Sequence, residues 1–212
     1  TASKKTPIKI WNAADGSAIA ELGPESKSTL YHEYSPDGSR LLSARLDGTI
    51  FIWDARTRKL IKSMVGHKGQ VYPARFDATG KRVVSCGADH SVRIWDAETG
   101  TQLYRYDEPN ASFSSALFSP DGRWVVFHKT PRPSDGSLAP PQTITIEVWE
   151  PDTNATIFSG QGTAYAISQD GRLLAIANGA MIALVSLPEG ENRMQLMGHS
   201  DPIYKLAFSP DG

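Results

Sequence analysis

The sequence predicts an all-β chain made of repeated units, each containing about four short antiparallel strands. A glycine-containing turn and a tryptophan both recur at intervals close to 42 residues along the 212-residue chain. Self-similarity at such a period is the signature of a repeat architecture. The segments between the turns are short and rich in β-branched and aromatic residues, as strands are. No stretch of useful length has the period of a helix.

The recurring turn is a four-residue motif that ends in glycine and most often reads Ser-Pro-Asp-Gly. Proline presets one backbone angle and glycine supplies a positive φ, which suits a hairpin between two strands. The motif closes at Gly38, Gly80, Gly122, Gly171 and Gly212. The intervals between these glycines are 42, 42, 49 and 41 residues, so the second half of the chain is less regular than the first.

The tryptophan repeats with the turn, at Trp11, Trp53, Trp95 and Trp149. Trp53 and Trp95 each follow their turn glycine by 15 residues, whereas Trp149 follows Gly122 by 27. The 12 additional residues, placed at 130–141, are rich in proline. They predict a long exposed loop between two strands.

These intervals divide the chain into six segments. The first holds only a third and a fourth strand, predicted over 8–11 and 18–22, and the last holds only a first strand, predicted over 203–208. The predicted segments are 1–22, the end of one unit; 23–64 and 65–106, two whole units; 107–158, a unit with the inserted loop; 159–197, a degenerate unit with Val185 at the tryptophan position; and 198–212, the start of another. About four whole units and two partial ones indicate a fragment of a longer protein.

The composition is that of a globular chain, with 40% hydrophobic residues, 21% charged residues and a formal net charge of -1. A near-neutral balance gives no reason to expect a nucleic-acid partner. The apolar runs are too short to span a bilayer, so no membrane partner is expected either. A single cysteine, Cys86, cannot form a disulfide framework and favours a reducing, cytoplasmic location.

The chain resembles the WD-repeat β-propeller family. The motifs that carry the resemblance in 65–106 are Gly66-His67, Phe76, Gly80, Ser85, Asp89 and Ile94-Trp95-Asp96. Those in 23–64 are Tyr34-Ser35-Pro36-Asp37-Gly38, Ser43, Asp47 and Trp53-Asp54. The resemblance implies four-stranded antiparallel blades. WD propellers usually have seven blades, so it also implies that the chain is part of a larger propeller.

In this family a well-formed blade holds a buried chain of hydrogen bonds between His, Ser or Thr, Asp and Trp. The resemblance assigns this structural tetrad to His67, Ser85, Asp89 and Trp95. The same residue types occur in a hydrolytic triad, with Ser85 as nucleophile and His67 as base. Their spacing matches the blade motif, and no G-x-S-x-G sequence occurs. We therefore predict a structural role and no catalytic residues.

The preceding repeat keeps only a partial tetrad of Ser43, Asp47 and Trp53, because Pro24 or Glu25 stands at the histidine position. The five histidines show no pairing at metal-ligand spacing. No phosphate-loop glycine pattern is present either. We therefore expect neither a metal nor a cofactor.

The resemblance also implies that partners bind a rim formed by the loops between blades, the starts of first strands and the turns between second and third strands. The start-of-strand positions are Leu30, Tyr72, Ser114, Thr163 and Tyr204. The positions before the turn aspartate are Leu46 and Ala88, with Arg45 and Gln70 nearby. Tyrosine is enriched at interface hot spots, so Tyr72 and Tyr204 are the strongest candidates. The alternative is that these tyrosines fill gaps between blades.

We predict a non-enzymatic scaffold that binds other proteins on this rim and has no small-molecule substrate. Two alternatives remain open. One is the propeller module of a serine-peptidase-like enzyme, since residues 119–127 also resemble repeats of that kind. The other, an interaction appendage of a bacterial signalling kinase, rests on resemblance alone. We further expect Trp124, which opens its strand, to be only partly covered, and Trp124→Ala to cost less stability than Trp95→Ala.

Overall fold

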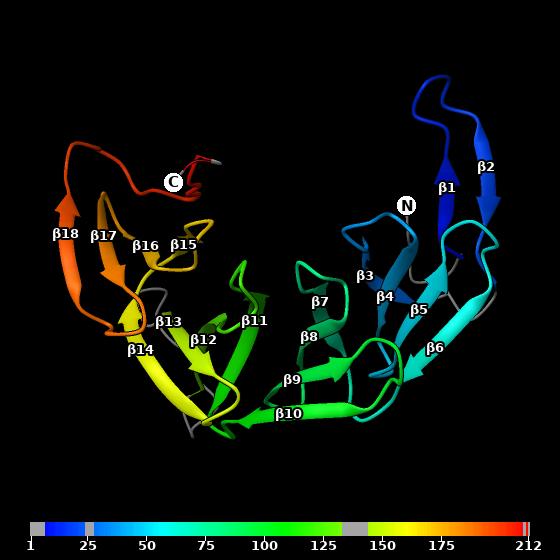
Figure 1. The fold of residues 1–212 in the computed structure, drawn as a ribbon, viewed down its shortest axis with the longest axis horizontal. Helices are drawn as coiled ribbons and strands as arrows, with labels where there is room; N and C mark the ends of the chain where they lie inside the picture. Colours follow the sequence, from blue (N-terminus) through cyan, green and yellow to red (C-terminus); the bar gives the residue numbers. More distant parts are fainter. Residues whose placement is uncertain (1–6, 24–27, 133–143, 210, 212) are drawn as a thin grey trace. The chain divides into compact units, whose positions relative to one another are not determined.

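The computed structural model describes residues 7–23, 28–132, 144–209 and 211 (Figure 1). Every regular element among them is a β-strand, and every strand pair is antiparallel, which confirms the all-β prediction. The strands form one two-stranded sheet and four four-stranded sheets, and neighbours in each sheet are consecutive in the chain. The chain divides into two compact units, Thr1–Pro109 and Asn110–Gly212.

Unit 1 contains three sheets. The first pairs β1 (Lys9–Trp11) with β2 (Ala18–Glu21). The second consists of β3 (Thr29–Tyr34), β4 (Arg40–Arg45), β5 (Ile50–Asp54) and β6 (Leu60–Met64). The third consists of β7 (Val71–Phe76), β8 (Arg82–Gly87), β9 (Ser91–Asp96) and β10 (Gln102–Asp107).

Unit 2 contains the other two sheets. One consists of β11 (Ala111–Phe118), β12 (Val125–Pro131), β13 (Thr145–Glu150) and β14 (Ala155–Gln161). The other consists of β15 (Ala164–Ile167), β16 (Leu173–Asn178), β17 (Met181–Ser186) and β18 (Asn192–Leu196). Most of the loop predicted at 130–141 lies outside the described residues.

The prediction of a strand over 203–208 is wrong. A strand needs a neighbour for its backbone N–H and C=O groups, and none of the described strands pairs with this segment. Ile203 anchors this segment. Its N–H donates to the carbonyl of Gly179 at 2.9 Å, and its side chain packs with Ala164 and Ala177. Leu206 packs against the same cluster.

The glycine turns repeat with nearly the same backbone geometry. Gly38, Gly80, Gly122 and Gly171 have φ values of 71°, 69°, 72° and 71°. The N–H of each donates to the carbonyl of the residue three positions earlier. The positive φ expected of the glycine is therefore confirmed at all four turns. Gly212 lies outside the described residues.

One register is shared by the four-stranded sheets. The residue at the tryptophan position of the third strand faces a residue near the start of the second strand. These pairs are Trp53 with Leu41, Trp95 with Val83, Trp149 with Val125, and Val185 with Leu174. Val185 therefore occupies the tryptophan position of its sheet, and all four third-strand residues are buried.

Apolar side chains fill the space between neighbouring sheets within each unit. In unit 1, Ile52 and Met64 of one sheet pack in a single cluster with Val71 and Val83 of the next. Removal of such side chains from water is the dominant favourable contribution to folding. The clusters therefore hold each pair of sheets together side by side.

The expectation that Trp124 is only partly covered is wrong. This residue precedes β12 and is only 2% exposed. It packs in one cluster with Leu174 and Leu187 of the following sheet in unit 2. Its position at the start of a strand faces that sheet rather than solvent, so the expected difference in cost between Trp95→Ala and Trp124→Ala loses its basis.

Candidate functional site

Four side chains of the β7–β10 sheet form a continuous chain of hydrogen bonds. Trp95 Nε1 donates to Ser85 Oγ at 2.8 Å. Ser85 Oγ lies 2.8 Å from His67 Nε2, and His67 Nδ1 lies 2.9 Å from Asp89 Oδ1. The loop before β7, strand β8, the turn after it and strand β9 each supply one residue. The structure thus brings together all four residues of the predicted tetrad.

The protonation states of His67 and Asp89 determine which group donates in each hydrogen bond of the tetrad. Burial lowers the pKa of His67 to about 4, against the opposing effect of Asp89. Burial alone would raise the pKa of Asp89, but hydrogen bonds from His67, the Lys68 N–H and Ser91 hold it well below its usual range. A neutral imidazole beside a carboxylate carries its proton on Nδ1 and accepts at Nε2. The indole of Trp95 therefore donates to Ser85, Ser85 to His67, and His67 to Asp89.

Three further residues, which the sequence reasoning missed, extend the network. Ser91 Oγ donates to Asp89 Oδ1 at 2.7 Å. Arg93 Nη2 donates to Asp89 Oδ2 at 2.7 Å, and Arg93 Nη1 donates to Gln102 Oε1 at 2.8 Å. Arg93 is only 4% exposed, so its charge depends on Asp89 for compensation. The available signal was the period-2 spacing of Ser91, Arg93 and Trp95, which places all three on one face of a strand.

The distances in this chain are those of a Ser-His-Asp triad, but its surroundings differ from those of an active site. Ser85 has 0% exposure, and its oxygen already accepts a hydrogen bond from Trp95. A nucleophile must touch its substrate. In this conformation the geometry allows Ser85 to stabilise the sheet and gives it no access to a substrate.

The partial tetrad of the β3–β6 sheet is only partly assembled. Trp53 Nε1 donates to Ser43 Oγ at 2.9 Å, as in the neighbouring sheet. Asp47 is not joined to this pair, because its half-exposed side chain pairs with Arg45 at 3.1 Å and accepts the Thr49 N–H at 3.0 Å. Pro24 and Glu25, at the predicted histidine position, lie outside the described residues.

The predicted contact residues of unit 1 lie where a second-to-third-strand turn meets the loop before a first strand. The Leu46 N–H donates to the Ser28 carbonyl at 3.1 Å. The Ala88 N–H donates to the Gln70 carbonyl at 2.8 Å in the same way. Each turn is therefore closed onto its own loop.

The turn of the β3–β6 sheet also lies against the loop of the β7–β10 sheet. A Cβ added at Gly48 would be 2.3 Å from the His67 carbonyl oxygen and 2.9 Å from the Gly69 carbonyl oxygen. The absence of a side chain at Gly48 permits this close approach. The contact residues of the two sheets therefore belong to one continuous surface.

Bulges in the first strands determine which side chains face outward. The pairing shifts between Thr29 and Tyr31, between Val71 and Ala74, and between Phe113 and Ser115. Each shift encloses a predicted contact position, namely Leu30, Tyr72 or Ser114. Bulges commonly re-aim a side chain, and here Leu30 is 38% and Tyr72 40% exposed. The sequence identified these positions but gave no signal of the bulges.

The remaining predicted contact residues differ in accessibility. Arg45 lies over the Phe51 ring at 5.2 Å, and its side chain is 20% exposed and paired with Asp47. Thr163 precedes β15 and is exposed. Tyr204 is 83% exposed but lies in the segment that forms no strand.

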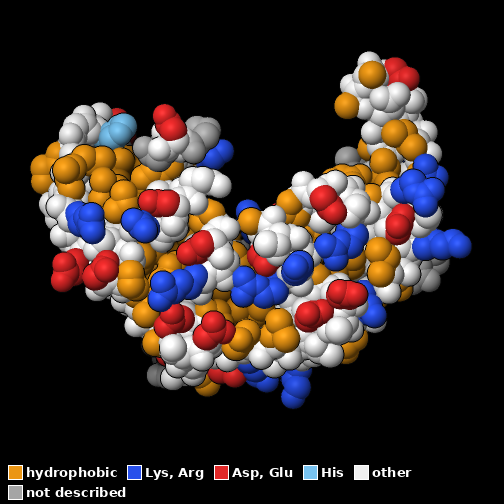
Figure 2. All heavy atoms as spheres, viewed as in Figure 1, with side chains coloured by type: hydrophobic (Ala, Val, Ile, Leu, Met, Phe, Trp, Pro, Cys, Tyr) orange, Lys and Arg blue, Asp and Glu red, His pale blue; other side chains and the backbone are white. Residues whose placement is uncertain are grey.

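A second exposed hydrophobic region, which the sequence reasoning missed, covers the last two strands of unit 2 (Figure 2). Its large apolar side chains are Met181, Met194, Leu196 and Met197. β18 is the edge strand of its sheet, and all five of its residues are exposed. The unbranched side chain of methionine adapts to irregular surfaces, and the clustering of Met194 and Met197 was the available sequence signal.

The part of the chain that the structure describes contains no cluster of three His, Cys, Asp or Glu side chains suited to a metal ion. Cys86 is fully buried, and burial raises the pKa of its thiol far above the usual range. Across the described ranges no helix has the length and hydrophobicity needed to cross a bilayer.

Comparison with known proteins finds repeats of one family in three stretches of the chain. The model of the WD domain, G-beta repeat, matches residues 27–54, 58–96 and 190–212. These three stretches are similar to WD repeats, and together they cover less than half of the chain. Domains of this family generally mediate protein–protein interaction and are generally non-catalytic. Strands β10 to β17 lie between the second and third matched stretches, and the repeat is least regular from β11 onward.

Minichromosome loss protein 1 of Schizosaccharomyces pombe is one relative of this chain. The two sequences are 36% identical over 61 residues. This alignment covers 29% of the present chain and 8% of the yeast protein. The chain therefore corresponds to a small part of that relative.

Proposed function

We propose that the chain is a non-catalytic scaffold that binds a partner protein on one face of unit 1, the bulge face, formed by Leu30, Leu46, Gln70, Tyr72 and Ala88. The observation that carries this proposal is the pair of bulges that turn Leu30 and Tyr72 outward from neighbouring first strands. Exposed apolar and tyrosine side chains surrounded by polar groups are typical of energetic anchors at interfaces. The Gln70 and Lys68 side chains supply such polar groups beside them.

The buried network supports the bulge face from below. Asp89 Oδ2 accepts the Lys68 N–H at 3.0 Å, while Asp89 Oδ1 contacts His67 at 2.9 Å. These bonds join the loop over 67–70 to the turn that carries Ala88. A binding surface held in one conformation loses less entropy on association. The tetrad therefore contributes to binding by fixing the loop, without contacting the partner.

We also propose a class of partner protein. The name of the yeast relative refers to minichromosome loss, so chromosomal proteins are the first candidates to test. Whether they apply to this chain depends on binding data, since the aligned region is 8% of that relative. The cytoplasmic location predicted from Cys86 stays a prediction.

Affinity capture with purified variants, followed by binding measurements on the captured protein, tests the proposal. Tyr72→Ala and Leu46→Ala should each weaken binding about thirtyfold or more, since truncation of a hot-spot residue costs about 2 kcal/mol or more. Tyr34→Ala is the matched control, because Tyr34 is 48% exposed at the other end of β3. Equal affinity in all three variants, or a loss confined to Tyr34→Ala, would place the binding surface elsewhere.

A further inference from the structure

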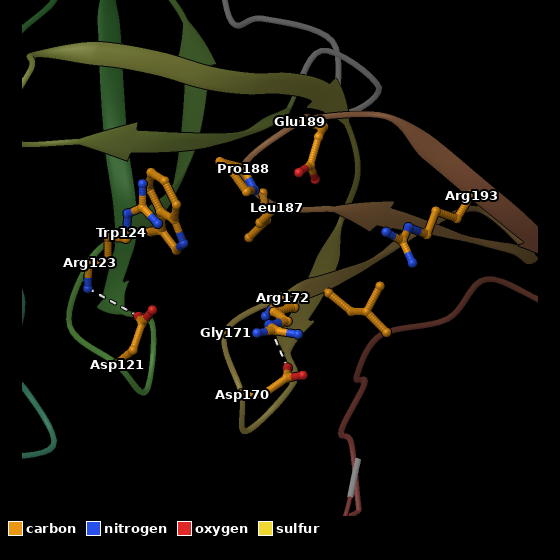
Figure 3. Close-up of a pocket in the computed structure, with 11 residues that line it drawn as sticks. Asp121, Arg123, Trp124, Asp170, Gly171, Arg172, Leu187, Pro188, Glu189 and Arg193 are labelled. Atoms are coloured by element: carbon orange, nitrogen blue, oxygen red, sulfur yellow. Dashed lines mark hydrogen bonds between the residues drawn. The ribbon is translucent and has the colours of Figure 1, made fainter.

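A polar hollow of about 710 Å³ lies within unit 2 (Figure 3). The glycine turns of the two sheets and the turn after β17 form its walls. Charged side chains of both signs line it, together with the edge of Trp124. This hollow is separate from the bulge face, which belongs to unit 1.

Trp124 is the unusual residue of the hollow. The other buried tryptophans donate their indole N–H to a side chain, Trp53 to Ser43, Trp95 to Ser85 and Trp149 to Asn154. Trp124 is equally buried at 2% exposure, but its Nε1–H meets no acceptor among the described residues. Figure 3 shows the indole nitrogen directed into the hollow. The nitrogen is not one of the fully buried side-chain atoms that lack a partner, so it is open to the hollow and can donate to water or to a ligand there.

Two arginines provide positive charge in the same space. Arg172 and Arg193 line the hollow, and neither forms an ion pair with any residue in the described ranges. Figure 3 shows Arg172 close to Asp170 in this view, and a serine hydrogen bond together with the charge of Arg172 lowers the pKa of Asp170. Arg123 is engaged differently, since it stacks on the Trp124 ring at 4.3 Å and pairs with Glu150 at 3.5 Å.

The acidic residues of the hollow limit the charge of a ligand. Asp121 and Asp170 each use Oδ1 to accept a serine hydroxyl and a backbone N–H within their own turn. Glu189 adds a third carboxylate to the lining. Three arginines and three carboxylates balance, so the hollow disfavours a polyanion. A single anionic group that lies beside Trp124 and Arg172 fits this balance.

We propose that the hollow binds a ligand through one carboxylate group, with Trp124 Nε1–H and the Arg172 guanidinium as donors. An arginine fork matches the two oxygens of a carboxylate, and charge-assisted hydrogen bonds are the stronger kind. Amide or ammonium groups of the same ligand would face Asp121, Asp170 and Glu189. A free amino acid and an acidic side chain of a bound protein are the two sources of such a group.

The indole N–H signals in a proton–nitrogen correlation spectrum test this proposal directly. The chain has five tryptophans, and Trp124→Phe identifies the signal of Trp124 by its loss. Sodium glutamate, the blocked peptide acetyl-Gly-Glu-Gly-amide and inorganic phosphate are titrated at constant ionic strength. We expect at least one carboxylate probe to shift the Trp124 signal to saturation. Arg172→Gln should weaken that binding about tenfold, whereas the exposed Arg56→Gln should leave it unchanged.

The relative affinities of the probes identify the source of the carboxylate group. Tighter binding of glutamate indicates a small molecule, and tighter binding of the peptide indicates a protein segment. The proposal is overturned if neither carboxylate probe shifts the Trp124 signal to saturation, which would mean that water alone fills the hollow. It is also overturned if Arg172→Gln binds as well as the parent chain, or if phosphate binds more tightly than both carboxylates.

Discussion

The β7–β10 and β11–β14 sheets share a strand register but fill the same positions with different chemistry. Ser85 faces Arg93 in the first sheet, and Phe127 faces Glu147 at the equivalent place in the second. Ser85 is a hydrogen-bonding hub, whereas Phe127 is fully buried and packs edge-on against the Phe113 ring at 5.4 Å. The same backbone arrangement is therefore stabilised by a polar network in one sheet and by aromatic packing in the other.

The second sheet also retains buried polar groups, and they have other partners than those in the first sheet. Trp149 Nε1 donates to Asn154 Oδ1 at 3.1 Å, which replaces the serine acceptor used by Trp95. Glu147 pairs with Lys129 and accepts a hydrogen bond from Ser159 at 3.2 Å. Trp149 and Glu147 have thus found partners nearby, as the cost of leaving a buried polar group unpaired favours. A repeat can thus lose its motif and keep its fold when the replacements satisfy one another.

The largest predicted effect concerns the two turn aspartates of unit 1. Asp89→Asn should lower the free energy of unfolding by about 3–5 kcal/mol, because it leaves the buried Arg93 without its counter-charge. Asp47→Asn, in the neighbouring sheet, should change it by less than about 0.5 kcal/mol, since the Asp47 side chain is half-exposed. Urea unfolding followed by tryptophan fluorescence measures both. Comparable losses in the two variants would show that the partial tetrad is as important as the complete one.

The pH dependence of stability should depend strongly on His67. Its pKa in the folded chain is about 4 and its ordinary value is 6.5, so the unfolded chain takes up the proton first as the pH falls. Stability should therefore decrease from about pH 6.5 towards pH 4, by up to about 1.4 kcal/mol per pH unit. Below this window the lowered pKa of Asp89 adds a loss of the same sign.

His67→Gln provides the control for this pH dependence. The substitution removes the titrating ring, so the slope between pH 6.5 and pH 4 should become shallower. Burial also lowers the pKa values of His32 and His128, which leaves a residual slope of the same sign. An unchanged slope in urea midpoints measured across this window would show that His67 does not titrate as proposed.

A smaller contrast separates two buried tryptophans. Trp95→Phe removes the donor to Ser85 and should cost about 1–2 kcal/mol, while Trp124→Phe removes an N–H that has no acceptor among the described residues and should cost less than about 0.5 kcal/mol. Both substitutions keep a large aromatic ring. Midpoint shifts in urea give the comparison. A larger loss for Trp124→Phe would indicate an internal acceptor for its indole.

The strands and turns were predictable from the sequence because their signals are local. Glycine at a positive φ and the short β-branched runs specify a hairpin without knowledge of the rest of the fold, as Gly38 and Gly122 illustrate. The segment 203–208 has the same local pattern, yet it forms no strand because pairing also needs a neighbour. A local signal thus specifies the tendency to form a strand and leaves the pairing undetermined.

The site was predictable only where a repeating motif existed. His67 and Ser85 belong to such a motif, whereas Arg93 and Gln102 join the network through side-chain contacts within the sheet that are not part of the motif. The burial of Trp124 likewise depends on the neighbouring sheet of unit 2. The features that the sequence did not predict therefore depend on side-chain contacts within and between sheets rather than on strand propensity.

The measurement that most directly tests the structural role of the tetrad is the free energy of unfolding of Ser85→Ala. Ser85 links the indole of Trp95 to the imidazole of His67. Its removal leaves two buried partners incompletely paired, so we predict a loss of about 1–3 kcal/mol. Catalytic groups are often held at a cost to stability, and their removal commonly leaves stability unchanged or higher. An unchanged or increased stability of Ser85→Ala would contradict a structural tetrad.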